Sequence, residues 1–340
     1  MNSEVSRKWT RMGLVLAREE RGGNSSVVGD PCIVWDEELP GWRMFLFCSP
    51  PGHAHGICRS REQIGPGCWE MVGPLLFANP GDLRGGATHK PFIIMDAHKP
   101  NTAARIDDRY WLVTVSYRGG HKVVQRAYAE HLAGPWTLEK GILINLGSGN
   151  DFDTKHVDAV SGFHFAERAE ILYFYMGYPE KPQNRAVSPY GSAQAVAVQG
   201  EREFRVEKRG IVLAPCQRAG HWASGWVGGL QLLPGTEHRW IAVVNASPTA
   251  PQPKDGAIHR EEPPPSLGGF AYCEEAWPVK NWQWCSNPIE WIEDIPEEAL
   301  QNGEGVNLWR QHILSLQDGR MALFYNSGSY GKEQLYLKIC

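Results

Sequence analysis

The stretch Lys-Trp-Thr-Arg-Met-Gly-Leu-Val-Leu, residues 8–16, is the first of five similar phrases that decide the fold. Each phrase has an aromatic residue, a few mixed residues that often end in glycine, and then a short aliphatic run. The aromatic positions are Trp9, Trp69, Trp136, Phe204 and Trp282, which gives a period of about 60 to 80 residues. A strand-like phrase that returns at such a period is typical of a radial repeat.

The intervals between the phrases share one order of elements: a strand, a polar turn, an aromatic-rich strand and a third strand. The expected first strands of the five intervals are residues 32–35, 102–106, 159–165, 229–233 and 312–316. Residues 248–267, rich in proline and charge, are expected to form a long surface loop within the fourth interval.

The two ends of the chain complement each other. The fifth interval has no phrase after it, and the phrase at Trp9 has no interval before it. If residues 9–16 pair with the C-terminal strands, a ring closes and two exposed sheet edges disappear. We therefore predict an all-β, five-bladed β-propeller with four antiparallel strands per blade, closed by the N-terminal strand. Residues 1–340 would form a single catalytic domain.

Composition limits the cellular compartments and the classes of binding partner that we expect. The formal charge is −4 and no stripe of lysine and arginine is visible, which disfavours nucleic acid and membrane partners. No apolar run approaches the roughly 20 residues of a spanning helix. Residues 1–9 lack a signal-peptide core, so we expect a cytoplasmic protein with its 8 cysteines reduced. Because CxxC and HExxH spacings are missing, we expect no metal and no cofactor; a cation on the propeller axis stays open, without a recognisable ligand set.

Polar residues at the starts of the inner strands are the candidates for a shared site, because these strands converge on one axis in a propeller. Asp30 lies in Gly-Asp-Pro before the first inner strand, Asp158 lies in Val-Asp-Ala before the third, and Glu304 lies at the entry to the fifth. The candidates for substrate binding are Asp96, His98, Lys99, Trp222, Trp226, Trp309, Arg310 and His312. The tryptophans among them could stack on the C–H faces of sugar rings or could pack the blades.

The blade pattern and several short motifs resemble the five-bladed propeller glycosidases, namely glycoside hydrolase families 43 and 32 and the related families 117 and 130. The motifs are Gly-Asp-Pro at 29–31, Val-Asp-Ala at 157–159, Gly-Ile-Cys-Arg-Ser at 56–60, Trp-Glu-Met-Val-Gly-Pro-Leu-Leu at 69–76 and Tyr-Asn-Ser-Gly-Ser-Tyr-Gly-Lys-Glu-Gln at 325–334. The resemblance implies a glycoside hydrolase acting on an oligo- or polysaccharide. It assigns Asp30 as general base or nucleophile and Asp158 as the carboxylate that tunes the acid and orients the sugar.

The sequence departs from family 43 where that family would place its acid, at the start of blade four. Residues 220–226 read Gly-His-Trp-Ala-Ser-Gly-Trp and contain no carboxylate. Glu304 is the first choice for the acid, with His312 and Asp96 as alternatives.

Two other functions stay open. A glycoside phosphorylase of family 130 type would need a cationic cluster for phosphate, for which His98, Lys99, Arg105 and Arg310 are candidates. A non-catalytic carbohydrate-binding propeller would explain the empty acid position in blade four.

Overall fold

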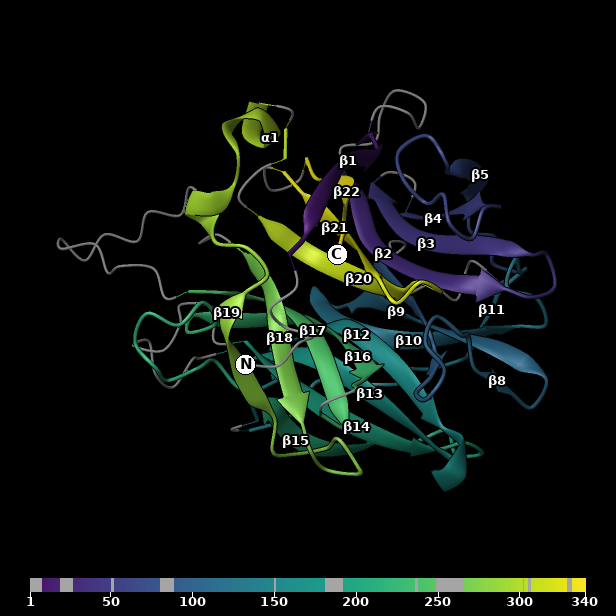
Figure 1. The fold of residues 1–340 in the computed structure, drawn as a ribbon. Helices are drawn as coiled ribbons and strands as arrows, with labels where there is room; N and C mark the ends of the chain where they lie inside the picture. Colours follow the sequence, from purple (N-terminus) through teal and green to yellow (C-terminus); the bar gives the residue numbers. More distant parts are fainter. Residues whose placement is uncertain are drawn as a thin grey trace.

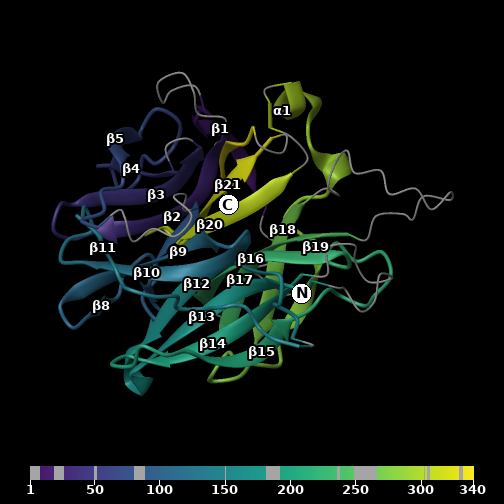
Figure 2. The same cartoon turned by 180° about the vertical axis from the view of Figure 1, so that it is seen from behind.

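A computed structural model describes residues 8–18, 27–49, 52–79, 89–149, 151–180, 192–235, 238–248, 266–301, 303–304, 307–328 and 332–340. Within these ranges no helix is long and apolar enough to cross a membrane. The main elements are antiparallel sheets arranged around a common axis (Figures 1 and 2). The helices whose full extent lies in the described residues are short: 3-10 turns at Ala166–Arg168 and Ile292–Asp294, and α1 (Glu297–Gln301).

Five sheets form five blades, each running from an inner strand at the axis to an outer strand. Blade I consists of β2 (Val27–Asp36), β3 (Gly41–Ser49), β4 (Gly52–Cys58) and β5 (Glu70–Pro74). Blade II consists of β6 (His89–Ile93), β9 (Arg109–Arg118), β10 (His121–Ala129) and β11 (Thr137–Leu138), with β8 (Arg105–Ile106) added to β9. Blade III consists of β12 (His156–Phe165), β13 (Glu170–Tyr178), β14 (Ala193–Gly200) and β15 (Glu207–Leu213), with β7 (Met95–Asp96) parallel to β12. Blade IV consists of β16 (Trp226–Pro234), β17 (Trp240–Ser247), β18 (Leu267–Cys273) and β19 (Gln283–Pro288). Blade V consists of β20 (Leu308–Ser315), β21 (Met321–Ser327), β22 (Gln334–Ile339) and β1 (Thr10–Leu16).

The ring closes through the N-terminal strand, as the sequence predicts. β1 pairs antiparallel with β22, with Thr10 opposite Ile339 and Leu16 opposite Leu335. The outer edge of blade V is thus covered by residues from the other end of the chain, which removes an edge that could pair with another protein. The predicted five-bladed propeller with four-stranded blades is confirmed.

The repeated aromatic residue has a common role in sealing neighbouring blades. Trp69 of blade I packs edge-on against Phe324 in β21, and Trp136 of blade II packs edge-on against Phe45 in β3. Trp282 of blade IV meets Phe174 in β13 in the same way. Each tryptophan therefore contacts the second strand of the preceding blade, and such edge-to-face pairs contribute roughly 0.5–1.5 kcal/mol beyond area burial. Phe204 is the exception, with 47% of its surface exposed.

The prediction of residues 102–106 as the inner strand of blade II is wrong. The structure uses β6 as the inner strand, and residues 102–106 contribute only β8 and isolated bridges. Both segments follow a His-Lys-Pro tripeptide, but only the first copy leads into the buried run Phe-Ile-Ile at 92–94. The predicted turn at Asp107 and Asp108 does lead into β9, and both residues have positive φ. The loop expected at 248–267 lies mostly outside the described residues.

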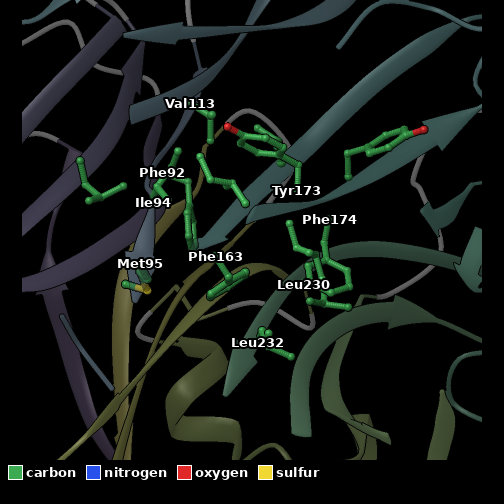
Figure 3. Packing of buried hydrophobic residues seen from close by; sticks show 14 of the residues in the cluster. Phe92, Ile94, Met95, Val113, Phe163, Tyr173, Phe174, Leu230 and Leu232 are labelled. Carbon is green, nitrogen blue, oxygen red and sulfur yellow. The ribbon is translucent and has the colours of Figure 1, made fainter. Parts of the chain in front are cut away.

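Aromatic side chains from the inner strands fill the axis. Phe92 of β6 lies edge-on to Phe163 of β12 at 5.6 Å, and His312 of β20 is 6.2 Å from Phe92, both measured between ring centroids. Figure 3 shows Phe92 and Phe163 within the continuous hydrophobic core that also includes Phe174 and Leu230. Aromatic and aliphatic side chains therefore fill this part of the axis.

Candidate functional site at the start of the inner strands

The five inner strands share an irregularity near their first residues. Against the second strand of its blade, each has a register shift, between Gly29 and Cys32, His89 and Phe92, Asp158 and Ser161, Val227 and Leu230, and Leu308 and Arg310. A β-bulge of this kind re-aims side chains and is common beside active sites.

Three of the bulges place a non-glycine residue at positive φ: Asp30 at 53°, Lys90 at 57° and Ala159 at 45°. Such conformations cost free energy and persist where the surrounding structure enforces them. Two of these residues carry charged side chains, and the third follows Asp158 directly.

Asp158 is the most strongly held carboxylate at these bulges. Only 1% of its surface is exposed. Its Oδ1 accepts hydrogen bonds from Lys90 Nζ at 2.8 Å and from the Ala159 backbone N–H at 2.7 Å. Its Oδ2 accepts one from Lys122 Nζ at 2.6 Å. Burial alone would raise the pKa of Asp158, but the ammonium groups of Lys122 and Lys90 outweigh it and hold the pKa well below the usual range. Asp158 is therefore ionised at neutral pH.

Asp30 lies in a different electrostatic environment. Burial raises the pKa of the Asp30 carboxyl, a change that Lys90 and Arg310 oppose and the Asp158 charge reinforces. The Asp30 backbone N–H donates to Asn326 Oδ1 of blade V at 3.4 Å. The preceding residue must be glycine, because a Cβ on Gly29 would lie 2.6 Å from the Asn326 side chain. The Gly-Asp-Pro sequence thus fits the close approach of blades I and V.

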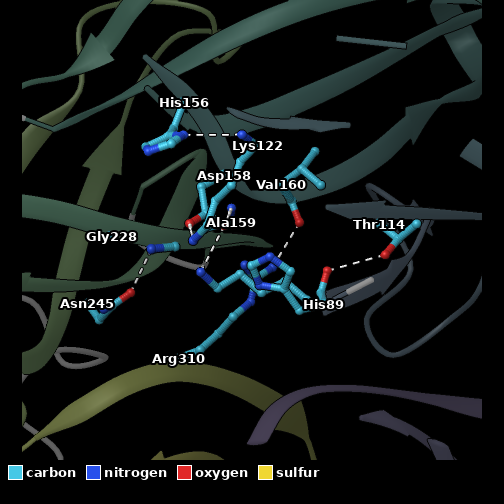
Figure 4. A network of polar contacts seen from close by, with 12 residues as sticks. His89, Thr114, Lys122, His156, Asp158, Ala159, Val160, Gly228, Asn245 and Arg310 are labelled. Carbon is cyan, nitrogen blue, oxygen red and sulfur yellow. Dashed lines mark hydrogen bonds and ion pairs between the residues drawn. The ribbon is translucent and has the colours of Figure 1, made fainter. Parts of the chain in front are cut away.

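Arg310 adds a third cation to the two lysines. It is buried, and its Nη2 donates to the Val160 carbonyl at 2.8 Å. Its Nη1 has no hydrogen-bond partner among the described residues. Figure 4 shows Arg310, Lys122 and Asp158 in one polar network. We call Asp30, Lys90, Lys122, Asp158 and Arg310 the axial cluster.

Histidines border the axial cluster. His156 Nδ1 accepts a hydrogen bond from the Lys122 backbone N–H at 3.1 Å, and burial together with Lys122 lowers the pKa of His156 to about 4. His89 stacks on Tyr117 with ring centroids 5.5 Å apart. His156 is therefore neutral at physiological pH.

Glu304, the predicted acid, belongs to a different cluster. Its carboxylate accepts hydrogen bonds from Arg11 of β1 and from the Tyr325 hydroxyl. Tyr325 and Asn326 are consecutive in β21, so their side chains point to opposite faces, and only Asn326 faces Asp30. We call Arg11, Glu290, Glu304, Tyr325 and Lys338 the seam cluster, because β1 closes the ring there.

The structure places Asp96, His98 and Lys99 away from the axial cluster. Asp96 in β7 pairs with His164, near the opposite end of β12 from Asp158. His98 contacts Glu167 at 3.0 Å, and 73% of the Lys99 side chain is exposed. These residues follow the inner strand of blade II instead of preceding it, which is the direct result of the misplaced strand.

The other predicted binding residues divide into buried and partly exposed ones. Trp222 is fully buried and its indole N–H donates to the Cys285 carbonyl at 2.9 Å, so it offers no face to a sugar. His312 is also fully buried, and burial lowers its pKa to about 3, which leaves it unsuited to donate a proton. Trp226 and Trp309 lie near the starts of β16 and β20 and stack with their ring centroids 6.2 Å apart. Trp309 is partly exposed.

Sequence reasoning missed Lys90 and Lys122. A signal existed for Lys90, since His-Lys-Pro-Phe-Ile-Ile at 89–94 aligns with Gly-Asp-Pro-Cys-Ile-Val at 29–34 and puts Lys90 in the place of Asp30. Lys122 comes from β10, a strand that does not line the axis, and no motif marks it. In the described part of the chain no group of three or more His, Cys, Asp or Glu side chains is placed to hold a metal ion.

No protein-family profile and no curated protein sequence matches this chain. Solved structures do match. A protein solved as an RGII complex has a TM-score of 0.71 at 13% identity, covering 99% of this chain and 92% of the other. The endo-arabinase from Bacteroides thetaiotaomicron VPI-5482 has a TM-score of 0.58 at 9% identity, covering 96% and 97%.

A third match comes from a study of the GH130 family of mannoside phosphorylases, which contains glycoside hydrolases that target beta-1,2 mannosidic linkages in Candida mannan. It has a TM-score of 0.57 at 11% identity, covering 92% of this chain and 83% of the other. Identities this low show the fold alone. The resemblance noted from the sequence is therefore confirmed as a shared five-bladed propeller of the kind found in glycoside hydrolases.

Proposed function

We propose that this protein cleaves a glycosidic bond in an oligo- or polysaccharide, with the axial cluster as its site. The observation that carries the proposal is a pair of buried carboxyls whose surroundings move their pKa values in opposite directions. Burial raises the pKa of Asp30, while two ammonium groups hold the pKa of Asp158 low. Two carboxyls in such different environments can take different roles, one reacting and the other staying ionised. The matches to carbohydrate-active propellers support the same class of substrate.

In this proposal Asp30 is the reacting carboxyl, acting as base or nucleophile. Burial moves the pKa of Asp30 towards neutral pH, and a general base works best when its pKa is near the working pH. Asp158 stays ionised and acts as an anchor that fixes Lys90 and Lys122. None of the three predicted acids, Glu304, His312 or Asp96, is a member of the axial cluster. With Asp30 as base, the leaving oxygen therefore takes its proton from solvent, and Asp30 returns to solvent the proton that it accepts from the attacking water.

A glycoside phosphorylase is the second candidate, favoured by the cations of the axial cluster. Lys90, Lys122 and Arg310 supply the positive charge that a phosphate group would need. Of the residues predicted for this purpose from the sequence, Arg310 is a member of the axial cluster. Arg105 pairs instead with Glu38 at 3.0 Å on the surface. Dependence of turnover on added phosphate separates the two candidates.

The test is Asp30→Asn in the full chain, assayed on aryl glycosides and on a panel of oligosaccharides, with and without phosphate. We expect kcat/KM to fall by about 10³-fold, within the range for the loss of an acid-base group. Asp108→Asn is the matched control, because Asp108 is also an aspartate at positive φ but lies exposed in a turn. Full activity in Asp30→Asn, or glycan binding by the wild type without any turnover, would rule out this assignment.

A further inference from the structure

The axial cluster contains more hydrogen-bond donors than its own carboxylates use. Among the described residues, the ammonium groups of Lys90 and Lys122 each donate to Asp158 and to no other side chain. An ammonium has three donor positions, so both lysines retain donors. Arg310 Nη1 is buried and unpartnered within the same described ranges, and a buried donor without a partner destabilises the folded protein.

The two lysines lie at the boundary with solvent, whereas Arg310 is buried behind it. About 19% of the Lys90 side chain and 23% of the Lys122 side chain are exposed, whereas the Asp158 side chain between them is 1% exposed. The bulge at Lys90 holds that residue at φ 57°, which fixes where its side chain starts. A ligand can therefore reach both lysines while Asp158 keeps them in place.

The charges of the axial cluster do not balance. The Asp30 carboxyl interacts with three positive charges, those of Lys90, Lys122 and Arg310, which lower its pKa. One negative charge of the cluster, that of Asp158, raises it. The proposed function requires Asp30 to be ionised, because it acts as a base. The cluster then has three cations and two carboxylates, and its net charge is +1. Uncompensated buried charge is costly, so one further negative charge would be favourable at this place.

We propose that the substrate is an acidic glycan, and that the axial cluster binds the carboxylate of a uronic acid unit through Lys90 and Lys122, with the buried Arg310 contributing its charge. The inference rests on the proposed function, because it takes the axial cluster as the substrate site. A carboxylate carries the single negative charge that restores balance, whereas a phosphate carries about −1.5 to −2 at neutral pH and would exceed it.

The test is equilibrium binding to the full chain, measured by calorimetry, with D-galacturonate and D-glucuronate against the neutral sugars D-galactose and D-glucose. Inorganic phosphate forms a separate arm. We expect a uronate to bind at least about ten-fold more tightly than its neutral counterpart, and the difference to shrink as salt rises. Lys90→Met should remove this preference, and Lys90→Arg should restore part of it.

Lys99→Met is the matched control, since Lys99 stands in the second His-Lys-Pro tripeptide but is exposed away from the axial cluster. Asp30→Asn tests the proposal without removing a cation. The substitution deletes a negative charge that competes with the ligand, so uronate should bind more tightly. Turnover should fall, as stated above for this variant. Circular dichroism confirms folding of each variant.

The possible results separate the two proposals. Equal binding of uronate and neutral sugar, or an equal loss in Lys99→Met and Lys90→Met, would overturn the acidic-glycan proposal while leaving glycosidase activity on neutral substrates intact. Binding of phosphate but not of uronate would also overturn it, in favour of a phosphorylase. Uronate binding without any turnover would support the proposed ligand and contradict the proposed reaction.

Discussion

The axial cluster and the seam cluster are both largely shielded groups of opposite charges, yet they are built differently. In the seam cluster two cations face two carboxylates: Arg11 pairs with Glu290 and Glu304, and Lys338 Nζ lies 2.6 Å from Glu290. In the axial cluster three cations face two carboxylates, donors remain unpaired among the described residues, and the backbone is strained at Asp30 and Lys90. The balanced network holds β1 in the ring, whereas the unbalanced and strained one is the site that we propose for a ligand.

The largest expected effect concerns the strand that connects the seam cluster to the ring. Deleting residues 1–16 removes β1 with Arg11, and exposes the β22 edge together with the apolar surface that Val15 and Leu16 cover. We expect the melting temperature to fall by more than about 10 °C, the size expected for a loss of several kcal/mol in a large domain. Differential scanning calorimetry measures it, with deletion of residues 1–7 alone as the control. A truncated protein that stays monomeric and melts like the wild type would contradict ring closure by β1.

A smaller effect on stability is expected from Glu304→Gln. The substitution leaves Arg11 with one carboxylate and weakens the contact with Tyr325, so the free energy of unfolding should fall by about 3 kcal/mol, as when one partner of a buried ion pair is removed. The value of kcat/KM should not change, which is the reverse of Asp30→Asn. Urea denaturation and activity assays measure the two quantities, and Glu298→Gln on the exposed face of α1 is the control. Lost turnover at unchanged stability would return Glu304 to the catalytic site.

The smallest effect is a pH dependence at Lys338. Burial lowers the pKa of Lys338 to about 8 from 10.5, although Glu290 opposes the change. Between these two pH values the unfolded chain binds more protons than the folded one, so this residue makes stability rise with pH through that window. We expect the melting temperature of the wild type to rise relative to Lys338→Met between about pH 8 and pH 10. Lys140→Met, at an exposed lysine, should show no relative rise. Parallel curves for Lys338→Met and the wild type would show that Lys338 titrates normally.

The fold could be read from the sequence because its signals are local and repeated. The phrase around each tryptophan marks an outer strand, and the unmatched copy at Trp9 is sufficient to predict ring closure. The error in blade II arose because two His-Lys-Pro tripeptides precede apolar segments close together in the chain, at 89–91 and 98–100. Only burial distinguishes the two copies, and burial depends on the neighbouring blades.

The site was less accessible to prediction because its partners come from distant elements. Asp30 and Asp158 stand next to recognisable inner strands, and the structure does bring both into the axial cluster. The partner of Glu304 is Arg11, which lies 293 residues away and is brought close only by ring closure. Lys122 reaches Asp158 from the third strand of its blade, where the alternation of side chains gives no sign of a functional role.

The pairing of Thr10 with Ile339 also bears on the order of folding. During synthesis β1 emerges first, but its partner β22 is among the last of these strands to leave the ribosome. Until then the growing chain is an open arc of blades, with β1 unpaired at one end and a free sheet edge at the other. The entropic cost of bringing the two strands together grows only slowly with the length of chain between them, by about 0.6 kcal/mol for each doubling. Late closure is therefore set by the time that translation takes, more than by this free-energy cost. The ring can close only after all five blades have been translated, and the nascent polypeptide must keep its two ends from pairing with other proteins until that moment.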